Sequence, residues 1–152
     1  MFAQTADGRK VQRGRLSPVA KTPVDAGVPV CVATLPGKDG RSGPERGADG
    51  LDETCYVSDQ PMGADGYWQI EYPVPRKGRV MVHTGTRDGK GFLANGRVEV
   101  SVNGKIWTRA GTFSAKDGTY AFRQATPFRF LRVIPAERLP KALIVRQVEV
   151  SE

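Results

Sequence analysis

The chain has 152 residues, a formal net charge of +7, and 18 glycines and 11 prolines scattered along its length. This length suits one compact domain that needs neither a metal nor a disulfide merely to fold, and the scattered glycines and prolines indicate turns between strands rather than a disordered tract. No apolar run approaches the roughly 20 residues that span a bilayer, and residues 1–16 lack the apolar stretch of a secretory signal.

The positive charge is concentrated near the N-terminus. Residues 1–22 carry a net charge of +4, whereas residues 23–152 hold 18 basic and 15 acidic side chains. A body so nearly balanced lacks the basic stripe that phosphate backbones require, so nucleic acid is not an expected partner. We interpret residues 1–22 as a basic linker or a loosely docked N-terminal segment, and residues 23–152 as the folded domain.

Short β-rich runs predict strands throughout that domain. The first run, residues 27–34, contains Pro29, which suits an edge strand, and a long glycine-rich loop follows over residues 36–50. Further strands are expected over residues 67–72, 79–84, 97–102, 105–109, 119–122, 128–134 and 142–150. Since no segment shows convincing helical periodicity, the pattern predicts an all-β jelly-roll β-sandwich of about eight antiparallel strands.

The clearest strand is residues 97–102, which ends at the dipeptide Asn103-Gly104. Asn-Gly tolerates the positive φ angles of a type I′ turn, so a hairpin is expected there. Two sets of apolar side chains are predicted to face the core: the alternating Val98, Val100 and Val102, and the tryptophans of two predicted strands, Trp68 and Trp107.

Six short motifs in a familiar order carry a resemblance to known domains. They are ADGLDETCY over 48–56, WQIEY over 68–72, RDG and NG over 87–96, VSVNGKIW over 100–107, FLRVI over 130–134 and VRQVEV over 145–150. Over about two thirds of the chain they resemble the discoidin-like domains, the coagulation-factor type C domains and, most closely, carbohydrate-binding module family 32. Tyr56 departs from the tryptophan that is usual there, and Tyr72 from the usual leucine.

The resemblance implies a galactose-binding-domain-like fold and a non-catalytic module. Such a module would bind a glycan, of galactose or N-acetylhexosamine type, through loops at one end of the sandwich. It would be a monomer and an accessory domain of a secreted or cell-surface bacterial glycan-active enzyme. The alternative is a protein- or membrane-surface adhesion module on the same fold, although a membrane is the less expected partner.

The resemblance also implies a structural calcium ion held by the turn that contains Asp49, Asp52 and Thr54 and by a side chain of the last strand. Carboxylates, hydroxyls and carbonyls on a bent loop are the ligands that calcium prefers. Gln147 is the best-aligned position on the last strand, and Glu149, on the same face, is the alternative. The competing interpretation is an Asx-type turn that its own side chains stabilise.

A loop at residues 87–95 offers the candidate sugar contacts. Phe92 lies there without any periodicity to bury it, so it is a candidate stacking platform, or else it folds over the sandwich edge. Donors and acceptors for sugar hydroxyls are expected from its polar neighbours and from a histidine at the end of the preceding strand, which are Arg87, Asp88, Lys90, Asn95 and His83. The histidine has a structural role as its alternative.

Two further hypotheses concern the membrane and catalysis. Phe92 and Leu93 on a loop flanked by basic residues would suit an anionic membrane surface. Catalysis finds little support, because the chain has one histidine and no Gly-x-Ser-x-Gly turn. The carboxylates of Asp49, Asp52 and Glu53 lie together on one turn rather than across a cleft. The two cysteines, Cys31 and Cys55, are expected as buried thiols, with a disulfide as the alternative.

Overall fold

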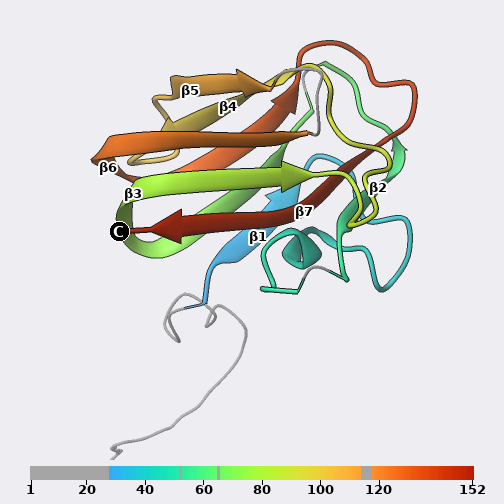
Figure 1. Cartoon of the computed structure of the whole chain (residues 1–152), viewed down its shortest axis with the longest axis horizontal. Helices are drawn as coiled ribbons and strands as arrows, with labels where there is room; N and C mark the ends of the chain where they lie inside the picture. The colour runs from blue at the N-terminus through green and yellow to red at the C-terminus, as the bar shows by residue number, and fades with distance from the viewer. Residues whose placement is uncertain (1–27, 52, 65, 114–117) are drawn as a thin grey trace, which may run out of the picture.

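The computed structural model describes residues 28–51, 53–64, 66–113 and 118–152, so the segment interpreted as a basic linker lies outside the described residues (Figure 1). The described residues form one short 3-10 helix, η1 (Pro44–Gly47), and seven strands. The strands are β1 (Val30–Ala33), β2 (Tyr56–Pro61), β3 (Trp68–Thr84), β4 (Gly96–Ser101), β5 (Thr108–Phe113), β6 (Thr119–Pro135) and β7 (Ala142–Ser151).

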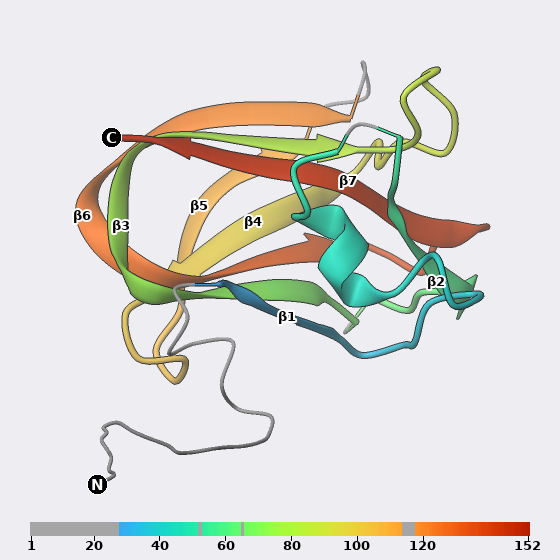
Figure 2. The same ribbon diagram turned by 90° about the horizontal axis from the view of Figure 1, so that it is seen from below.

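Two long, bent strands connect the two layers of the sandwich. The strand order is β2-β7-β3-β6-β4-β5, with β1 paired to β3, and every pairing is antiparallel. The first part of β3 pairs with β1 and with the last part of β6, whereas its second part pairs with β7 and with the first part of β6. In Figure 2 both strands curve from one layer into the other. The predicted all-β jelly-roll sandwich is therefore confirmed.

The strand boundaries differ from the prediction in several places, and the strand expected over residues 105–109 is β5, which runs from Thr108 to Phe113. Residues 67–72 and 79–84 were expected as separate strands, and so were 119–122 and 128–134, but β3 and β6 each run through the expected break. Strands β3 and β6 are not paired between Glu71 and Arg76. Pro73 and Pro75 lie in this unpaired stretch, so their lack of an amide hydrogen costs no hydrogen bond between these strands. Strand β2 was missed, because its register with β7 is irregular and its sequence does not alternate.

The core lies between the two layers. Trp68, Val98 and Val100 are buried there as predicted. Val102 is 61% exposed and Trp107 lies outside the core cluster, so both of those core predictions are wrong. The largest fully buried side chains are Trp68, Tyr56, Phe128, Met62, Ile70, Leu131 and Leu143.

The β4–β5 connection explains both errors. The predicted hairpin is present, but β4 ends at Ser101 and β5 begins at Thr108, so the turn is longer than a two-residue type I′ turn. Gly104 adopts a φ of 78°, and the Asn103 Oδ1 atom accepts hydrogen bonds from the backbone amides of Lys105 and Ile106. Val102 and Trp107 therefore lie in the connection rather than in the paired strands.

The bends of β3 and β6 lie at one end of the sandwich, and the end of β3 and the start of β6 lie at the other. Ser101 at the end of β4 pairs with Phe130, which pairs with Glu71 just before the β3 bend. The end with the bends and residues 102–107 is here called the hairpin pole. The other end, with residues 48–51, 53–55 and 85–95, is called the loop pole (Figure 2).

Both cysteines are partly buried thiols that form no disulfide, so the disulfide alternative does not hold. Burial, together with the negative charges of Glu45 and Asp49, raises the pKa of Cys31 to about 12. Among the described residues no helix is long and apolar enough to span a bilayer.

Candidate functional site

The tip of the 85–95 loop is a closed turn that presents its charged side chains to solvent. The Thr86 amide donates to the Lys90 carbonyl at 2.8 Å, and the Gly89 amide donates to the Thr86 carbonyl at 2.9 Å. The Lys90 amide also donates to the Thr86 hydroxyl at 3.1 Å. These bonds fix the backbone while Arg87 and Asp88 remain exposed.

An open hollow lies between this turn and the segment before β2. Its lining residues are Glu53, Cys55, Thr86, Arg87 and Asp88. The Arg87 Nη1 atom lies 3.3 Å from the Glu53 Oε2 atom, and both side chains are 66% exposed. A hydrogen bond from the Thr86 hydroxyl holds the pKa of Asp88 below its usual value, so this carboxylate is an acceptor at neutral pH.

Phe92 lies apart from that hollow. It is half-buried and lines a second shallow hollow with residues 139–143. Its backbone packs against Gly85, where an added Cβ atom would come within 2.9 Å of the Phe92 nitrogen. Leu93 is only 2% exposed, and its amide donates to the Thr84 hydroxyl at 2.9 Å. The hypothesis that Leu93 forms an apolar loop tip for a membrane is therefore wrong, because Leu93 belongs to the core.

The other candidate sugar contacts are dispersed. His83 lies on the outer face of the sheet, with its Nε2 atom 3.2 Å from Glu149 and its Nδ1 atom 3.3 Å from the Thr119 hydroxyl. The Lys90 ammonium lies 3.9 Å from Asp88, and the backbone carbonyl of the exposed Asn95 accepts from the Ala136 amide. The structure thus brings Arg87 and Asp88 together with Lys90 nearby, but it does not place His83 or Phe92 in the same hollow.

The predicted calcium turn is closed by its own hydrogen bonds. The Asp49 carboxylate accepts from the Leu51 amide at 3.0 Å and from the Thr54 hydroxyl at 2.5 Å, and Arg46 lies 3.8 Å away. Asp52 lies outside the described residues. In the part of the chain that the structure describes, no three His, Cys, Asp or Glu side chains gather as a metal site.

Gln147 is nevertheless positioned for a ligand role. Its Oε1 atom is buried and accepts no hydrogen bond from the described residues. Because Tyr56 pairs with Val145 in an antiparallel ladder, Thr54 and Gln147 lie toward the same end of that ladder. Glu149 shares the outer face with Gln147 as expected, but its carboxylate is engaged with His83.

Sequence reasoning missed three members of the loop-pole hollow. Glu53 was considered only as a catalytic carboxylate, and Cys55 only as a buried thiol. Thr86 was not predicted as a site residue, although it directly precedes the Arg-Asp-Gly motif, which was used to predict the site. No local pattern signals that residues 53–55 and 86–88 meet, because their proximity depends on the pairing of β2 with β7 and of β7 with β3.

No protein-family model matches the sequence, and no curated protein is significantly similar to it. Solved structures are similar at the level of the fold. A family 32 carbohydrate-binding module, from a family 31 glycoside hydrolase of Clostridium perfringens, superposes with a TM-score of 0.66 at 12% identity, covering 82% of this chain and 94% of the module.

Two further modules with a similar structure have a named carbohydrate ligand. The family 32 module of C. perfringens NanJ, solved in complex with galactose, gives a TM-score of 0.64 at 14% identity, covering 86% of this chain and 96% of that one. Chitosan-binding module 1, from a chitosanase/glucanase of Paenibacillus sp. IK-5, gives 0.66 at 18% identity, covering 81% and 94%. This chain therefore has the galactose-binding-like β-sandwich fold of these modules.

Proposed function

We propose that this domain binds carbohydrate through the loop pole and catalyses no reaction of its own. The observation that carries the proposal is the fold, which it shares with several modules named for binding sugars. The polar hollow at the loop pole gives the fold a surface with suitable chemistry. Because one fold can serve many functions, the proposal also depends on whether the residues of that hollow can bind a sugar.

Sugar hydroxyls both donate and accept hydrogen bonds, and the loop-pole hollow offers partners for both roles. Arg87 donates through a planar guanidinium, which suits a pair of hydroxyls or a sugar carboxylate. Glu53 and Asp88 accept, and the closed turn from Thr86 to Lys90 holds Arg87 and Asp88 in place before a ligand arrives. The exposed Asn95 and the half-buried Phe92 lie farther along the same loop, outside this hollow, so they would contact only a ligand that extends beyond it.

The arrangement of the one histidine supports a non-catalytic role. Thr119, His83 and Glu149 form a chain of contacts that resembles a nucleophile, a base and an orienting acid. However, these side chains lie on the outer face of the sheet, and none of them lines the hollows that the described residues form at the two poles. Those hollows would therefore not orient a substrate against the Thr119 hydroxyl.

A glycan array with galactose- and N-acetylhexosamine-terminated glycans tests the proposal. We expect binding by the intact chain and at least a tenfold loss of affinity for Arg87→Ala. Arg123→Ala, which removes an exposed arginine far from the hollow, is the matched control and should bind as the intact chain does. Binding only to anionic vesicles would favour the adhesion alternative, and equal binding by both variants would remove Arg87 from the site.

We also propose that a calcium ion binds beside the turn at residues 49–54. Asp49, Thr54 and the otherwise unpartnered Gln147 Oε1 atom would be its side-chain ligands, and the ion would tie this turn to β7. The nearby Arg46 guanidinium and the neutral amide of Gln147 both predict weak affinity. The expected result is a rise of a few degrees in melting temperature with calcium, absent in Gln147→Met; identical melting with calcium and with chelator would refute the site.

Binding of this kind suits an accessory domain of a secreted or cell-surface protein that acts on glycans. Two of the modules that share the fold come from a family 31 glycoside hydrolase and from a chitosanase/glucanase. A monomeric domain with one shallow polar site would keep its parent protein near a polysaccharide. Sedimentation of the purified chain would test the monomeric state directly.

A further inference from the structure

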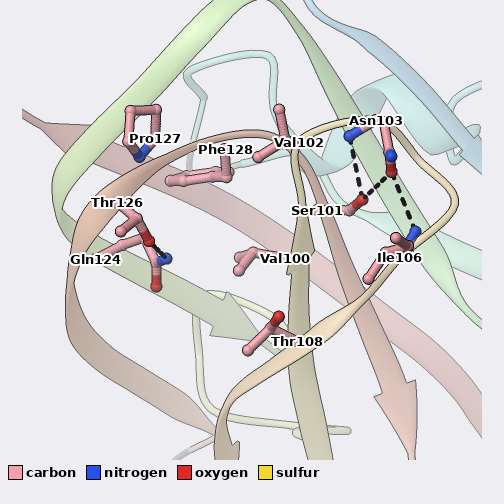
Figure 3. A pocket seen from close by; sticks show the side chains of 10 residues that line it. All are labelled: Val100, Ser101, Val102, Asn103, Ile106, Thr108, Gln124, Thr126, Pro127 and Phe128. Carbon is pink, nitrogen blue, oxygen red and sulfur yellow. Dashed lines mark hydrogen bonds between the residues drawn. The ribbon is translucent and has the colours of Figure 1, made fainter.

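The hairpin pole contains a hollow that the proposed sugar site does not use. It has a volume of about 300 Å³, near the lower limit for small-molecule pockets. Figure 3 shows side chains from three strands and the β4–β5 connection around it. The lining residues are Val100, Ser101, Val102, Asn103, Ile106, Thr108, Gln124, Thr126, Pro127 and Phe128.

No lining residue of this hollow is charged, in contrast to the hollow at the loop pole. Val100 and Phe128 are buried and form an apolar floor, whereas Val102 and Ile106 stand at the rim with 61% and 75% of their surfaces exposed. Exposed aliphatic side chains beside a concave surface become favourable when a ligand covers them. The absence of lining charge disfavours an ionic ligand, because no side chain of the hollow would compensate the charge of an ion that loses its water.

The polar side chains supply both donors and acceptors. Gln124 donates from its Nε2 atom to the Thr126 hydroxyl at 2.9 Å, which leaves the Gln124 carbonyl oxygen as an acceptor and the Thr126 hydroxyl as a donor. Thr108, on the opposite wall, carries a hydroxyl that fills either role and makes no side-chain hydrogen bond to the described residues. A ligand with hydroxyl groups would match such a set.

The rim of the hollow is held rigidly before any ligand binds. The Ser101 hydroxyl accepts from the Gly104 amide at 2.9 Å, and the Asn103 Oδ1 atom accepts from the Lys105 amide at 2.8 Å and from the Ile106 amide at 3.0 Å. These bonds fix the turn and leave the Asn103 side-chain amide hydrogens as donors. A rigid rim reduces the entropy that binding would cost.

We propose that this hollow is a second binding site, which accepts one uncharged sugar unit. Its apolar floor and rim would cover the C–H face of the sugar, and Thr108, Gln124 and Thr126 would bond to the hydroxyls. The choice of a sugar, rather than another neutral hydroxylated ligand, rests on the proposed function. With one site at each pole, a single domain would bridge two glycan chains and gain avidity without any change of structure.

Nuclear magnetic resonance titration of the full chain with neutral galactose, N-acetylgalactosamine and chito-oligosaccharides tests this site. We expect shifts of the side-chain amides of Asn103 and Gln124 and of the Ile106 methyl groups. Thr108→Val and Gln124→Ala should each weaken these shifts at least fivefold in apparent affinity. Both positions lie at the surface of the fold, so the variants are expected to remain folded, and an unchanged melting temperature checks this.

The two sites are distinguished with Arg87→Ala, which should leave the hairpin-pole shifts unchanged. Shifts confined to the loop pole would overturn the second site and leave the proposed function intact. Shifts confined to the hairpin pole would support the second site and overturn the loop-pole site. No shift with any of these sugars would overturn both, and Ile106 shifts with anionic vesicles alone would assign the hairpin pole to a membrane surface instead.

Discussion

At the scale of single residues, the two tryptophans have different environments, although the sequence predicted that both would lie in the core. Trp68 is fully buried, its Nε1 atom donates to the Pro44 carbonyl at 2.8 Å, and Gly47 lies against its ring. Trp107 lies outside the core, with the guanidinium of Arg132 4.0 Å from its ring centroid. Burial and a hydrogen bond stabilise the first, whereas a cation–π contact stabilises the second.

The same substitution at both positions should therefore have unequal effects. Trp68→Phe removes part of a buried ring and leaves the Pro44 carbonyl without its donor, so we expect a loss of about 2–3 kcal/mol in the free energy of unfolding. Trp107→Phe keeps an aromatic ring near Arg132 and should cost less than about 1 kcal/mol. Urea denaturation followed by circular dichroism measures both, and equal losses would contradict the assigned environments.

At the scale of elements, the end of β3 organises the loop pole. The buried Thr84 hydroxyl donates to the Gly118 carbonyl at 2.7 Å and accepts from the Leu93 amide at 2.9 Å. One side chain thus connects the 85–95 loop to the segment that precedes β6. Gly118 adopts a φ of 74°, and an added Cβ atom there would come within 2.4 Å of both Thr84 and Phe92.

Thr84→Val tests this connection, because valine has nearly the shape of threonine but lacks the hydroxyl. The Gly118 carbonyl keeps its bond from the backbone amide of residue 84, but the buried Leu93 amide loses its acceptor, so we expect a loss of about 1–3 kcal/mol in the free energy of unfolding and weaker glycan binding through the loosened loop. Thr112→Val, at an exposed position of β5, should change the unfolding free energy by less than about 0.5 kcal/mol. Similar losses in both variants would mean that the hydroxyl of Thr84 has no special role.

Local patterns predicted the elements that depend on local pairing. Alternation predicted β4 with Val98 and Val100 inward, and Asn103-Gly104 predicted the hairpin that follows. The continuity of β3 and β6 through Pro73, Pro75 and Pro127 was not predictable, because it depends on two layers pairing over the bend. Within the candidate site, loop residues such as Arg87 were predictable, whereas their meeting with Glu53 depends on long-range pairing of β2, β7 and β3.

At the scale of the whole molecule, the core that the structure describes spans almost the whole domain expected from the sequence. Every member of the core cluster and every residue packed against it lies between Cys31 and Val150. Strand β1 is the first described strand, and it pairs only with β3. The net charge of +4 in residues 1–22 belongs to the segment that the sequence predicts to be a basic linker or a loosely docked N-terminal segment.

Deleting residues 1–22 tests whether they belong to the fold. Because the sequence predicts a linker or a loosely docked segment there, we expect the free energy of unfolding to change by less than about 0.5 kcal/mol, with glycan binding at the loop pole unchanged. The deletion also lowers the net charge from +7 to +3, so any weak, salt-sensitive attraction of the intact chain to anionic polymers should fall. Denaturation and glycan titration of both forms give the answer: a loss above about 2 kcal/mol would show that the segment packs on the domain, since so large a change requires buried contacts.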